Sequence, residues 1–331
     1  MTGPAPKAVV DSRGRIKRKL RVSLTDRCNL RCHYCMPEHP RWLPRAALMS
    51  NAELLRLVGL FVRTLGITEL RLTGGEPLLR PDVPELVGAL GLLRGEGLQR
   101  IALTSNGVRL AAVAAALRDA GLDDLNVSLD AITPTVFTAL TRGQIEPVLA
   151  GIEAATAVGL PLKLNCVVIK GANEAEVLPL TQWAKARRLP LRFIEFMPLD
   201  GRQSWAGDKV VREDEIIAAL GARFHLQPLA RSHDPAQYYA VDDDGYRIGV
   251  ISTISKPFCS TCDRLRLDAR GRLYTCLFSS TETDLLAPLR AGASDADLLA
   301  LIRNSVWSKP AGYAEQPGYV ERPITMHHLG G

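Results

Sequence analysis

The stretch KLRVSLTDRCNLRCHYC, residues 19–35, joins an apolar run to a closely spaced set of cysteines. Residues 20–25 are mostly apolar or β-branched, which predicts a buried β-strand. Similar runs recur along the chain between helical stretches of about a dozen residues, the pattern of consecutive βα units. The expected strands cover residues 20–25, 69–73, 100–105, 125–128, 162–168 and 190–196. The expected helices cover residues 52–65, 83–93, 109–120, 146–158 and 177–188.

Consecutive βα units with right-handed crossovers predict an α/β fold, an incomplete (β/α)6 barrel of the TIM type. In such a sheet, ligands collect at the carboxyl ends of the strands. After about Asp200 the alternation ends, so we expect two domains. Residues 1–200 would form the partial barrel, and residues 201–331 a smaller C-terminal α+β region. Further strands are expected at residues 246–252, 264–268 and 272–277.

Three cysteines, Cys28, Cys32 and Cys35, form a Cys-x3-Cys-x2-Cys loop directly after the first strand. Three thiolates can ligate three irons of a four-iron cluster and leave the fourth iron open for another ligand. The alternatives are a zinc site with His33 as the fourth ligand, or three core thiols.

A glycine-rich turn, residues 73–77, ends the second expected strand with the sequence TGGEP. Two glycines allow the backbone to approach a ligand closely, and Glu76 can accept a hydrogen bond from an ammonium group. Such turns are common as plain chain reversals, so the motif alone is a weak indication of a ligand site. Its position relative to the cysteines makes the indication strong.

Composition limits the classes of function. The chain has 331 residues, 47% hydrophobic and 23% charged, which suits one large α/β barrel or two ordinary domains. No apolar run reaches the ~18 residues of a membrane-spanning helix, and the start lacks the apolar stretch of a signal peptide. We therefore expect a cytoplasmic protein without a membrane partner. The net charge of +6 favours anionic partners, but the low aromatic content of 5% argues against nucleic acid.

A second set of three cysteines, Cys259, Cys262 and Cys276, lies near the end of the chain, and Cys166 stands alone. In a long cytosolic chain, such sets more often hold metal than form disulfides. By itself the second set could hold zinc, form a disulfide or hold an iron–sulfur cluster. Beside the first set, a second cluster with an open iron is the better hypothesis. Cys166 is expected to be an inert core thiol.

The expected hairpin at residues 264–277 brings basic side chains to the second cysteine set. With Gly271 in the left-handed conformation, Cys276 lies opposite Arg264. Side chains two positions apart share one face of a strand, so Arg264 and Arg266 point the same way. They could cradle a cluster beside an anionic or guanine-bearing ligand. The alternative is that both arginines form the solvated face of an amphipathic strand.

These features together resemble the radical S-adenosylmethionine (SAM) superfamily, and within it the GTP 3′,8-cyclases of molybdenum cofactor synthesis. The resemblance extends over nearly the full length. The stretches that carry it are residues 20–28, 73–77, 126–131, 192–197 and 258–267, followed by Gly330 and Gly331.

The resemblance implies a lyase that converts GTP into (8S)-3′,8-cyclo-7,8-dihydroguanosine 5′-triphosphate, the first step of molybdenum cofactor (molybdopterin) biosynthesis. A 5′-deoxyadenosyl radical from SAM would remove the hydrogen at C3′ of the ribose, and the carbon radical would add to C8 of guanine. Two [4Fe–4S] clusters would be held by the six cysteines of the two sets, with SAM on the first. GTP would lie between the clusters, with its guanine on the open iron of the second.

The site residues follow from the same resemblance. The expected SAM contacts are Tyr34, Gly75, Glu76, Ser128 and Met197. The expected GTP contacts are Arg21, Arg71, Thr104, Lys163, Arg192, Arg264 and Arg266. The residues expected to act in catalysis are Arg264, Arg266, Gly330 and Gly331. Glu69 departs from the family, which has a lysine near the triphosphate at that position.

The C-terminal tail has three interpretations. It could be a frayed end, or a carrier tail activated for thiocarboxylate transfer. The resemblance favours a third, in which Gly330 and Gly331 enter the cavity between the clusters, because only glycine lacks a side chain that would block the way. His327 and His328 are expected to be tail residues and not ligands.

The resemblance also implies partners. A reducing electron donor such as flavodoxin or ferredoxin is expected, and so is the next enzyme of the pathway, cyclic pyranopterin monophosphate synthase. A homodimer is left open. The rival functions are a radical SAM peptide-modifying enzyme, which usually has more cysteines in its appended region, and a non-catalytic iron–sulfur or zinc regulator.

Overall fold

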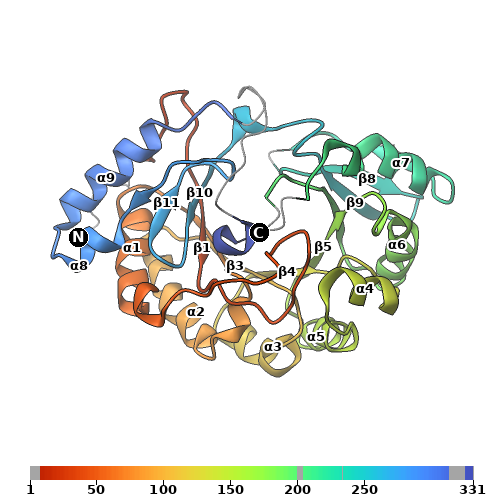
Figure 1. Cartoon of the computed structure of the whole chain (residues 1–331), viewed down its shortest axis with the longest axis horizontal. Coiled ribbons are helices and arrows are strands. Elements are labelled where there is room, and N and C mark those ends of the chain that lie inside the picture. The colour runs from red at the N-terminus through yellow and green to blue at the C-terminus, as the bar shows by residue number, and fades with distance from the viewer. Residues whose placement is uncertain (1–7, 200–203, 233, 313–324, 331) are drawn as a thin grey trace.

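The computed structural model describes residues 8–199, 204–232, 234–312 and 325–330 (Figure 1). The strands in its first half are β1 (Lys19–Ser23), β2 (Glu69–Thr73), β3 (Arg100–Ser105), β4 (Asp124–Ser128), β5 (Leu162–Val168) and β6 (Leu191–Glu195). Those in its second half are β7 (Leu226–Pro228), β8 (Gln237–Val241), β9 (Tyr246–Ile251), β10 (Arg264–Leu267), β11 (Arg272–Tyr274) and β12 (Thr283–Asp284). The strands expected from the sequence are all present, with ends that differ by up to three residues.

The strands of the described residues form one mixed sheet in the order β12-β11-β10-β1-β2-β3-β4-β5-β6-β9-β8-β7. Neighbouring strands from β10 through β1–β6 to β9 are parallel. The outer strands at both edges are antiparallel. The sheet is curved, and helices line its outer side (Figure 1). The C-terminal strands therefore extend the same sheet at its two edges, next to β1 and β6.

The helices include every one that the sequence predicted. They are α1 (Asn51–Arg63), α2 (Val83–Gly91), α3 (Leu110–Asp119), α4 (Pro134–Thr141), α5 (Glu146–Ala157), α6 (Val177–Ala186), α7 (Glu213–Gly221), α8 (Leu286–Arg290), α9 (Asp295–Trp307) and α10 (Met326–Leu329). Short 3-10 helices lie at Arg45–Ala47, Pro77–Leu79, Leu92–Glu96, Glu174–Glu176, Gly207–Lys209 and Cys259–Thr261. Helices α4 and α7–α10 were not expected from the sequence. Of the helices in the described ranges, none has the length and apolar content needed to cross a membrane.

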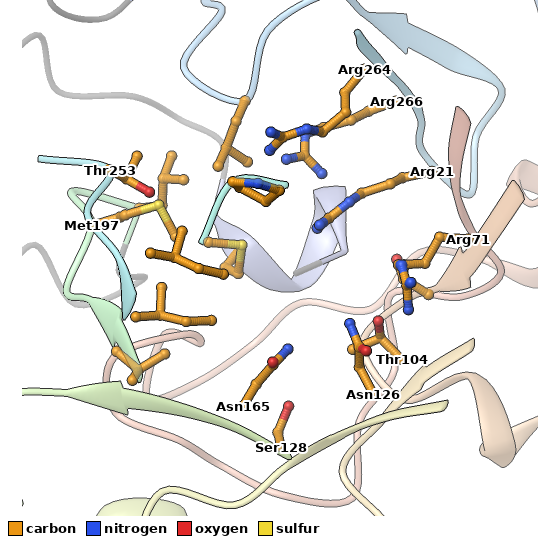
Figure 2. A pocket seen from close by; sticks show the side chains of 18 of the residues that line it. Arg21, Arg71, Thr104, Asn126, Ser128, Asn165, Met197, Thr253, Arg264 and Arg266 are labelled. Atoms are coloured by element: carbon orange, nitrogen blue, oxygen red, sulfur yellow. The ribbon is translucent and has the colours of Figure 1, made fainter. Parts of the chain in front are cut away.

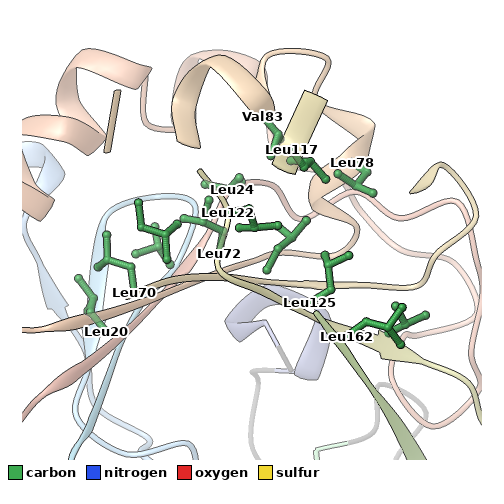
Figure 3. Packing of buried hydrophobic residues seen from close by; sticks show 14 of the residues in the cluster. Leu20, Leu24, Leu70, Leu72, Leu78, Val83, Leu117, Leu122, Leu125 and Leu162 are labelled. Carbon is green, nitrogen blue, oxygen red and sulfur yellow. The ribbon is translucent and has the colours of Figure 1, made fainter. Parts of the chain in front are cut away.

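The core lies between the outer face of the sheet and the helices (Figure 3). Leu20 and Leu70 are fully or almost fully buried and belong to this layer, as does Leu72. Burying one leucine side chain contributes about 1.5–3 kcal/mol. Because side chains alternate along a strand, the intervening Arg21 and Arg71 point to the inner face. One alternating pattern thus supplies both the core and a polar interior.

The predicted hairpin between β10 and β11 is confirmed. Asp268 N donates to Arg272 O at 3.0 Å, and Gly271 has a φ of +70°. A side chain at Gly271 would also approach Leu286 Cβ to 2.8 Å, so glycine is required here for two reasons. The second strand is shorter than expected and ends at Tyr274, and Cys276 lies beyond the ladder.

Candidate active site

A cavity of about 350 Å³ lies on the inner face of the curved sheet (Figure 2). Side chains of β1–β6 and of β10 line it, together with the loops that follow these strands. All six cysteines of the two sets line this one cavity. The cysteines are far apart in the sequence, and the order of the strands brings them together.

The loop with Cys28, Cys32 and Cys35 is held by the glycine-rich turn after β2. Gly75 N donates to Thr25 O at 2.7 Å, so the turn and the cysteine loop are joined backbone to backbone. A Cβ at Gly75 would lie 2.3 Å from Arg27 O. From the sequence, the glycines were expected to allow close approach of a ligand. The structure adds a second reason, since the glycines also allow the turn to pack on the backbone before the first cysteine.

The chemistry of the first three thiols fits a metal cluster. Burial raises the pKa of Cys28 to about 11. Burial also raises the pKa values of Cys32 and Cys35, and the charges of neighbouring cysteines add to the shift. Such thiols keep their protons at neutral pH unless a positively charged metal centre displaces them.

The geometry does not support the alternative hypothesis of a zinc ion at the first cysteine set with His33 as the fourth ligand. His33 does not line the cavity. In the described ranges, no group of three or more His, Cys, Asp or Glu side chains is arranged around one metal-ion position. A four-iron cluster does not need that arrangement, because each thiolate binds a different iron.

The side chain of Glu76, an expected SAM contact, does not line the cavity. The buried carboxylate instead accepts hydrogen bonds from Leu78 N at 2.9 Å, Ser105 Oγ at 2.9 Å and Asn106 N at 2.7 Å. Burial raises its pKa to about 7. These hydrogen bonds hold the turn against β3, and a contact of Glu76 with the ammonium group of SAM stays a prediction.

The other expected cofactor contacts, Tyr34, Gly75, Ser128 and Met197, all line the cavity. Tyr34 Oη donates to the Asp130 carboxylate. Asp130 Oδ1 in turn accepts from Val167 N at 2.8 Å, which ties the ring to β5. Tyr34 is therefore fixed beside the first cysteine set.

The second cysteine set consists of free thiols, so the structure has no disulfide at this set. Cys262 N donates to Cys259 O at 3.2 Å within a 3-10 turn. Burial acts to raise the pKa of Cys262, but Lys309 and Arg264 outweigh it and lower the pKa to about 7. The lowered pKa favours the thiolate form, which metal ligation requires. Cys166 is a buried thiol of the core, as expected.

Basic side chains dominate the cavity. The lining contains nine Lys or Arg residues and three Asp or Glu residues. All six expected basic GTP contacts are among them. Arg21 lies beside Arg71 of β2 and Arg266 of β10 in the parallel register. Burial, followed by the charges of neighbouring arginines, lowers the pKa of Arg21 well below its usual value. Such a group of cations needs a ligand with several negative charges.

The alternative in which Arg264 and Arg266 face solvent is wrong. The residue Arg266 is 5% exposed, and the Arg264 side chain is 18% exposed. Figure 2 shows both guanidinium groups pointing into the cavity near Arg21. Arg264 also lies over the Phe258 ring, with its guanidinium carbon 4.9 Å from the ring centroid.

Three buried oxygens in the cavity lack a hydrogen-bond partner within the described structure. They are Thr73 Oγ1, Thr104 Oγ1 and Asn126 Oδ1. An unsatisfied buried polar atom costs about 1–3 kcal/mol, so Thr104 Oγ1 and Asn126 Oδ1 point to a bound ligand, whereas Gly330 packs against Thr73 Oγ1. Thr104 was expected as a site residue, whereas Asn126 was not.

Asn165 is another cavity residue that was not expected from the sequence, and its Oδ1 accepts from Arg192 Nε at 3.0 Å. The sequence spacing could have identified both asparagines as cavity residues, since Asn126 lies two positions before Ser128 and Asn165 two positions after Lys163. Side chains two apart share a strand face, so both asparagines could have been placed in the cavity.

Gly330 packs inside the curved sheet, where α10 lies at its centre (Figure 1). Gly330 has a φ of +72°, and Arg266 Nη1 donates to Gly330 O at 3.4 Å. A Cβ at Gly330 would lie 1.5 Å from Thr73 Oγ1. The hypothesis of a frayed end is therefore wrong for Gly330, while Gly331 lies outside the described residues.

Two further residues named in the sequence analysis, His327 and Glu69, have well-defined surroundings in the structure. His327 is 2% exposed, and burial lowers its pKa to about 3, so it is part of the packed interior and not of a loose tail. Glu69 lines the cavity between two cations, with its carboxylate 3.7 Å from Lys19 Nζ and 3.9 Å from Arg100 Nη1. It neutralises part of the positive charge at that position.

Comparison with known proteins gives consistent matches over the whole chain. Residues 22–184 match the family model of the radical SAM superfamily, and residues 189–315 match that of molybdenum cofactor synthesis C. A GTP 3′,8-cyclase of Streptomyces coelicolor is 44% identical over 330 residues, which cover 98% of this chain and 96% of that protein. GTP 3′,8-cyclase 2 of Mycobacterium tuberculosis is 46% identical over 340 residues, with 100% and 93% covered.

A solved structure supports the fold. Streptococcus suis SuiB bound to S-adenosylmethionine has a TM-score of 0.59 with this chain at 12% identity. The match covers 87% of this chain and 68% of that one. The fold is thus an α/β radical SAM fold with a mixed sheet.

The steric role of Gly75 can be tested by replacing it with alanine. Overpacking typically costs about 1–3 kcal/mol, so Gly75→Ala should lower the thermal unfolding temperature and reduce iron at the first cysteine set. Gly88→Ala is the matched control, because a Cβ at Gly88 meets no heavy atom within 4 Å. Iron analysis and thermal unfolding measure both variants. Normal iron and stability in Gly75→Ala would contradict the packing argument.

Proposed function

This chain belongs to the GTP 3′,8-cyclase family of the radical SAM superfamily, and on that basis we propose that it carries out this family's reaction. It would convert GTP to (8S)-3′,8-cyclo-7,8-dihydroguanosine 5′-triphosphate, the first step of molybdenum cofactor biosynthesis. The observation that carries the proposal is one cavity lined by both cysteine sets and by nine basic side chains.

The triphosphate of GTP supplies the negative charges that the cavity needs. Arg21, Arg71 and Arg192 reach the inner face from three different strands. Their mutual repulsion in a buried site is relieved when phosphate oxygens lie between them. Arg71 already has a carboxylate partner, Asp124 Oδ1 at 3.4 Å. Arg21, which neighbours two other arginines, is therefore the residue that gains most from a phosphate group.

The ribose and base have polar partners as well. Thr104 Oγ1 and Asn126 Oδ1 can accept hydrogen bonds from ribose hydroxyl groups. Arg264 and Arg266 would hold the guanine beside the second cysteine set. These contacts restrict the substrate to one orientation, which is the main requirement for a ring closure between C3′ and C8 of the same molecule.

Cys28, Cys32 and Cys35 would hold the first [4Fe–4S] cluster, with Tyr34, Gly75, Ser128 and Met197 around SAM. When bound, SAM at the reduced cluster supplies the 5′-deoxyadenosyl radical that removes the C3′ hydrogen. The protein's own part is to exclude water and other hydrogen donors. Flavodoxin or ferredoxin would deliver the electron, and cyclic pyranopterin monophosphate synthase would take the product.

Cys259, Cys262 and Cys276 would hold a second [4Fe–4S] cluster. This proposal is supported by the lowered pKa of Cys262 and by the cavity that the two cysteine sets share.

For the fold, we propose that β1–β6 and their helices form the incomplete (β/α)6 barrel. The boundary near residue 200 stays a prediction, and the continuous sheet means that the two regions would not be separate layers.

Substitution of Arg264 and Arg266 tests the proposed substrate. Arg264→Ala and Arg266→Ala should keep both clusters and form far less product. Removing one charged group that binds the substrate in a dry cavity costs about 2–4 kcal/mol, or about two to three powers of ten in rate. Arg272→Ala on β11 is the matched control, because Arg272 does not line the cavity. Mass spectrometry quantifies the cyclised product. Wild-type turnover in either variant would show that these arginines do not hold the substrate.

The terminal glycines are expected to align the substrate. Gly330→Ala, or deletion of Gly330 and Gly331, should leave iron content and GTP binding near normal. Product should fall about 100-fold, since small misplacements can cost that much. Gly292→Ala is the control, because Gly292 also has a positive φ of +86° but its Cβ would meet nothing within 4 Å. An equal effect of both alanine variants would mean that backbone strain, and not the blocked site, causes the loss.

A further inference from the structure

Two chain segments that the proposed reaction does not use enclose the second cysteine set. From the N-terminal side, Arg15 Nη1 donates to Cys259 O at 3.0 Å and Lys17 Nζ to Cys262 O at 2.8 Å. From the C-terminal side, a Cβ at Gly312 would lie 2.3 Å from Cys259 Cβ. The same C-terminal segment contributes Lys309, which is 3% exposed.

Lys309 contacts the second cysteine set directly. Its ammonium donates to Cys262 Sγ at 3.5 Å and to Arg264 O at 3.1 Å. It also donates to Thr275 O, next to the third cysteine of the set. One buried ammonium therefore joins the two chain segments that carry Cys262 and Cys276.

The charge of Lys309 is not balanced by a carboxylate. Lys17 pairs with Asp11 Oδ2 at 2.8 Å, and Arg15 with the same oxygen at 2.6 Å. Among the residues that the structure describes, Lys309 has no ion pair with Asp or Glu. A buried ammonium without a counter-charge is costly, so a negative group is expected at Cys262 Sγ.

Neutral donors contact a sulfur atom in both sets, and Phe278 N donates to Cys276 Sγ at 3.4 Å in the second, so the charged donor Lys309 is what distinguishes the second set. Cys28 Sγ accepts from Leu30 N at 3.4 Å and from Asn106 Nδ2 at 3.6 Å, and both donors are neutral. Hydrogen bonds to sulfur and nearby charge both set the reduction potential of an iron–sulfur cluster. The two sets therefore differ in a property that controls electron transfer.

We propose that Lys309 is a positioning residue that raises the reduction potential of the second cluster through its hydrogen bond to Cys262 Sγ. The inference rests on the proposed second cluster. A one-electron reduction adds one negative charge, and a fixed ammonium at the sulfur stabilises the reduced form more than the oxidised form. The second cluster would then accept an electron more easily than it would without Lys309, and it would do so beside the substrate.

The test is a redox titration of the second cluster followed by electron paramagnetic resonance, with dithionite as the one-electron reductant. The full chain carrying Cys28→Ala, Cys32→Ala and Cys35→Ala holds the second cluster alone, so the signal is unambiguous. Lys309→Met removes the charge and the donor, and Lys309→Gln removes only the charge. Lys185→Met is the control, because it removes one positive charge on α6, away from both sets.

In Lys309→Met we expect the ratio of reduced to oxidised cluster at a fixed potential to fall about tenfold, which is about 59 mV for one electron. Lys309→Gln should shift in the same direction, and Lys185→Met should not shift. An unchanged potential in Lys309→Met with iron retained would overturn the inference. Loss of iron in both Lys309 variants would also overturn it, because Lys309 would then serve folding alone.

Iron analysis of the wild-type chain separates this inference from the proposed function. About eight irons per chain are expected for two cubane clusters, and about half in the variant without the first set. Zinc, or no metal, at Cys259, Cys262 and Cys276 would contradict the proposed second cluster itself. Two intact clusters with an unshifted potential would contradict only the role of Lys309.

Discussion

The repulsion among buried arginines is the constraint on which the rest of this site depends. The parallel register of β10, β1 and β2 puts Arg266, Arg21 and Arg71 at neighbouring positions of the sheet. The opposite faces of the same strands carry the leucines of the core, so the arginines cannot turn away without exposing it. The fold therefore holds like charges together, and a polyanionic ligand is the physical means of balancing them. The two cysteine sets border the space where that ligand would lie.

Much of this arrangement could be predicted from the sequence, because its signals are local. Residues 69–73 predicted a strand, and Gly271 predicted the left-handed turn of the hairpin, which places Arg264 and Arg266 on one strand face. Pairings between distant segments have no such local pattern. The parallel pairing of β10 with β1 and of β9 with β6 was therefore not predicted.

Glu76 and Gly75 show a second limit of sequence reasoning. Sequence reasoning can identify a motif and still miss the contacts that its residues make with the rest of the chain. Gly75 is required because Arg27 O lies where a Cβ would be, and Glu76 satisfies backbone and hydroxyl donors of the adjoining turn and strand. Gly330 is the opposite case. The sequence analysis proposed glycine there because a side chain would block the entry of the tail into the cavity, and the close approach of Gly330 to Thr73 agrees with that reason.

In the proposed reaction, the cavity brings C3′ of GTP to the SAM-derived radical. The most direct measurement uses GTP carrying deuterium at C3′, with dithionite and SAM, and mass spectrometry of the 5′-deoxyadenosine released. We expect 5′-deoxyadenosine to form only when GTP is present and to carry one deuterium. Formation at the same rate without GTP, or 5′-deoxyadenosine without deuterium, would contradict it.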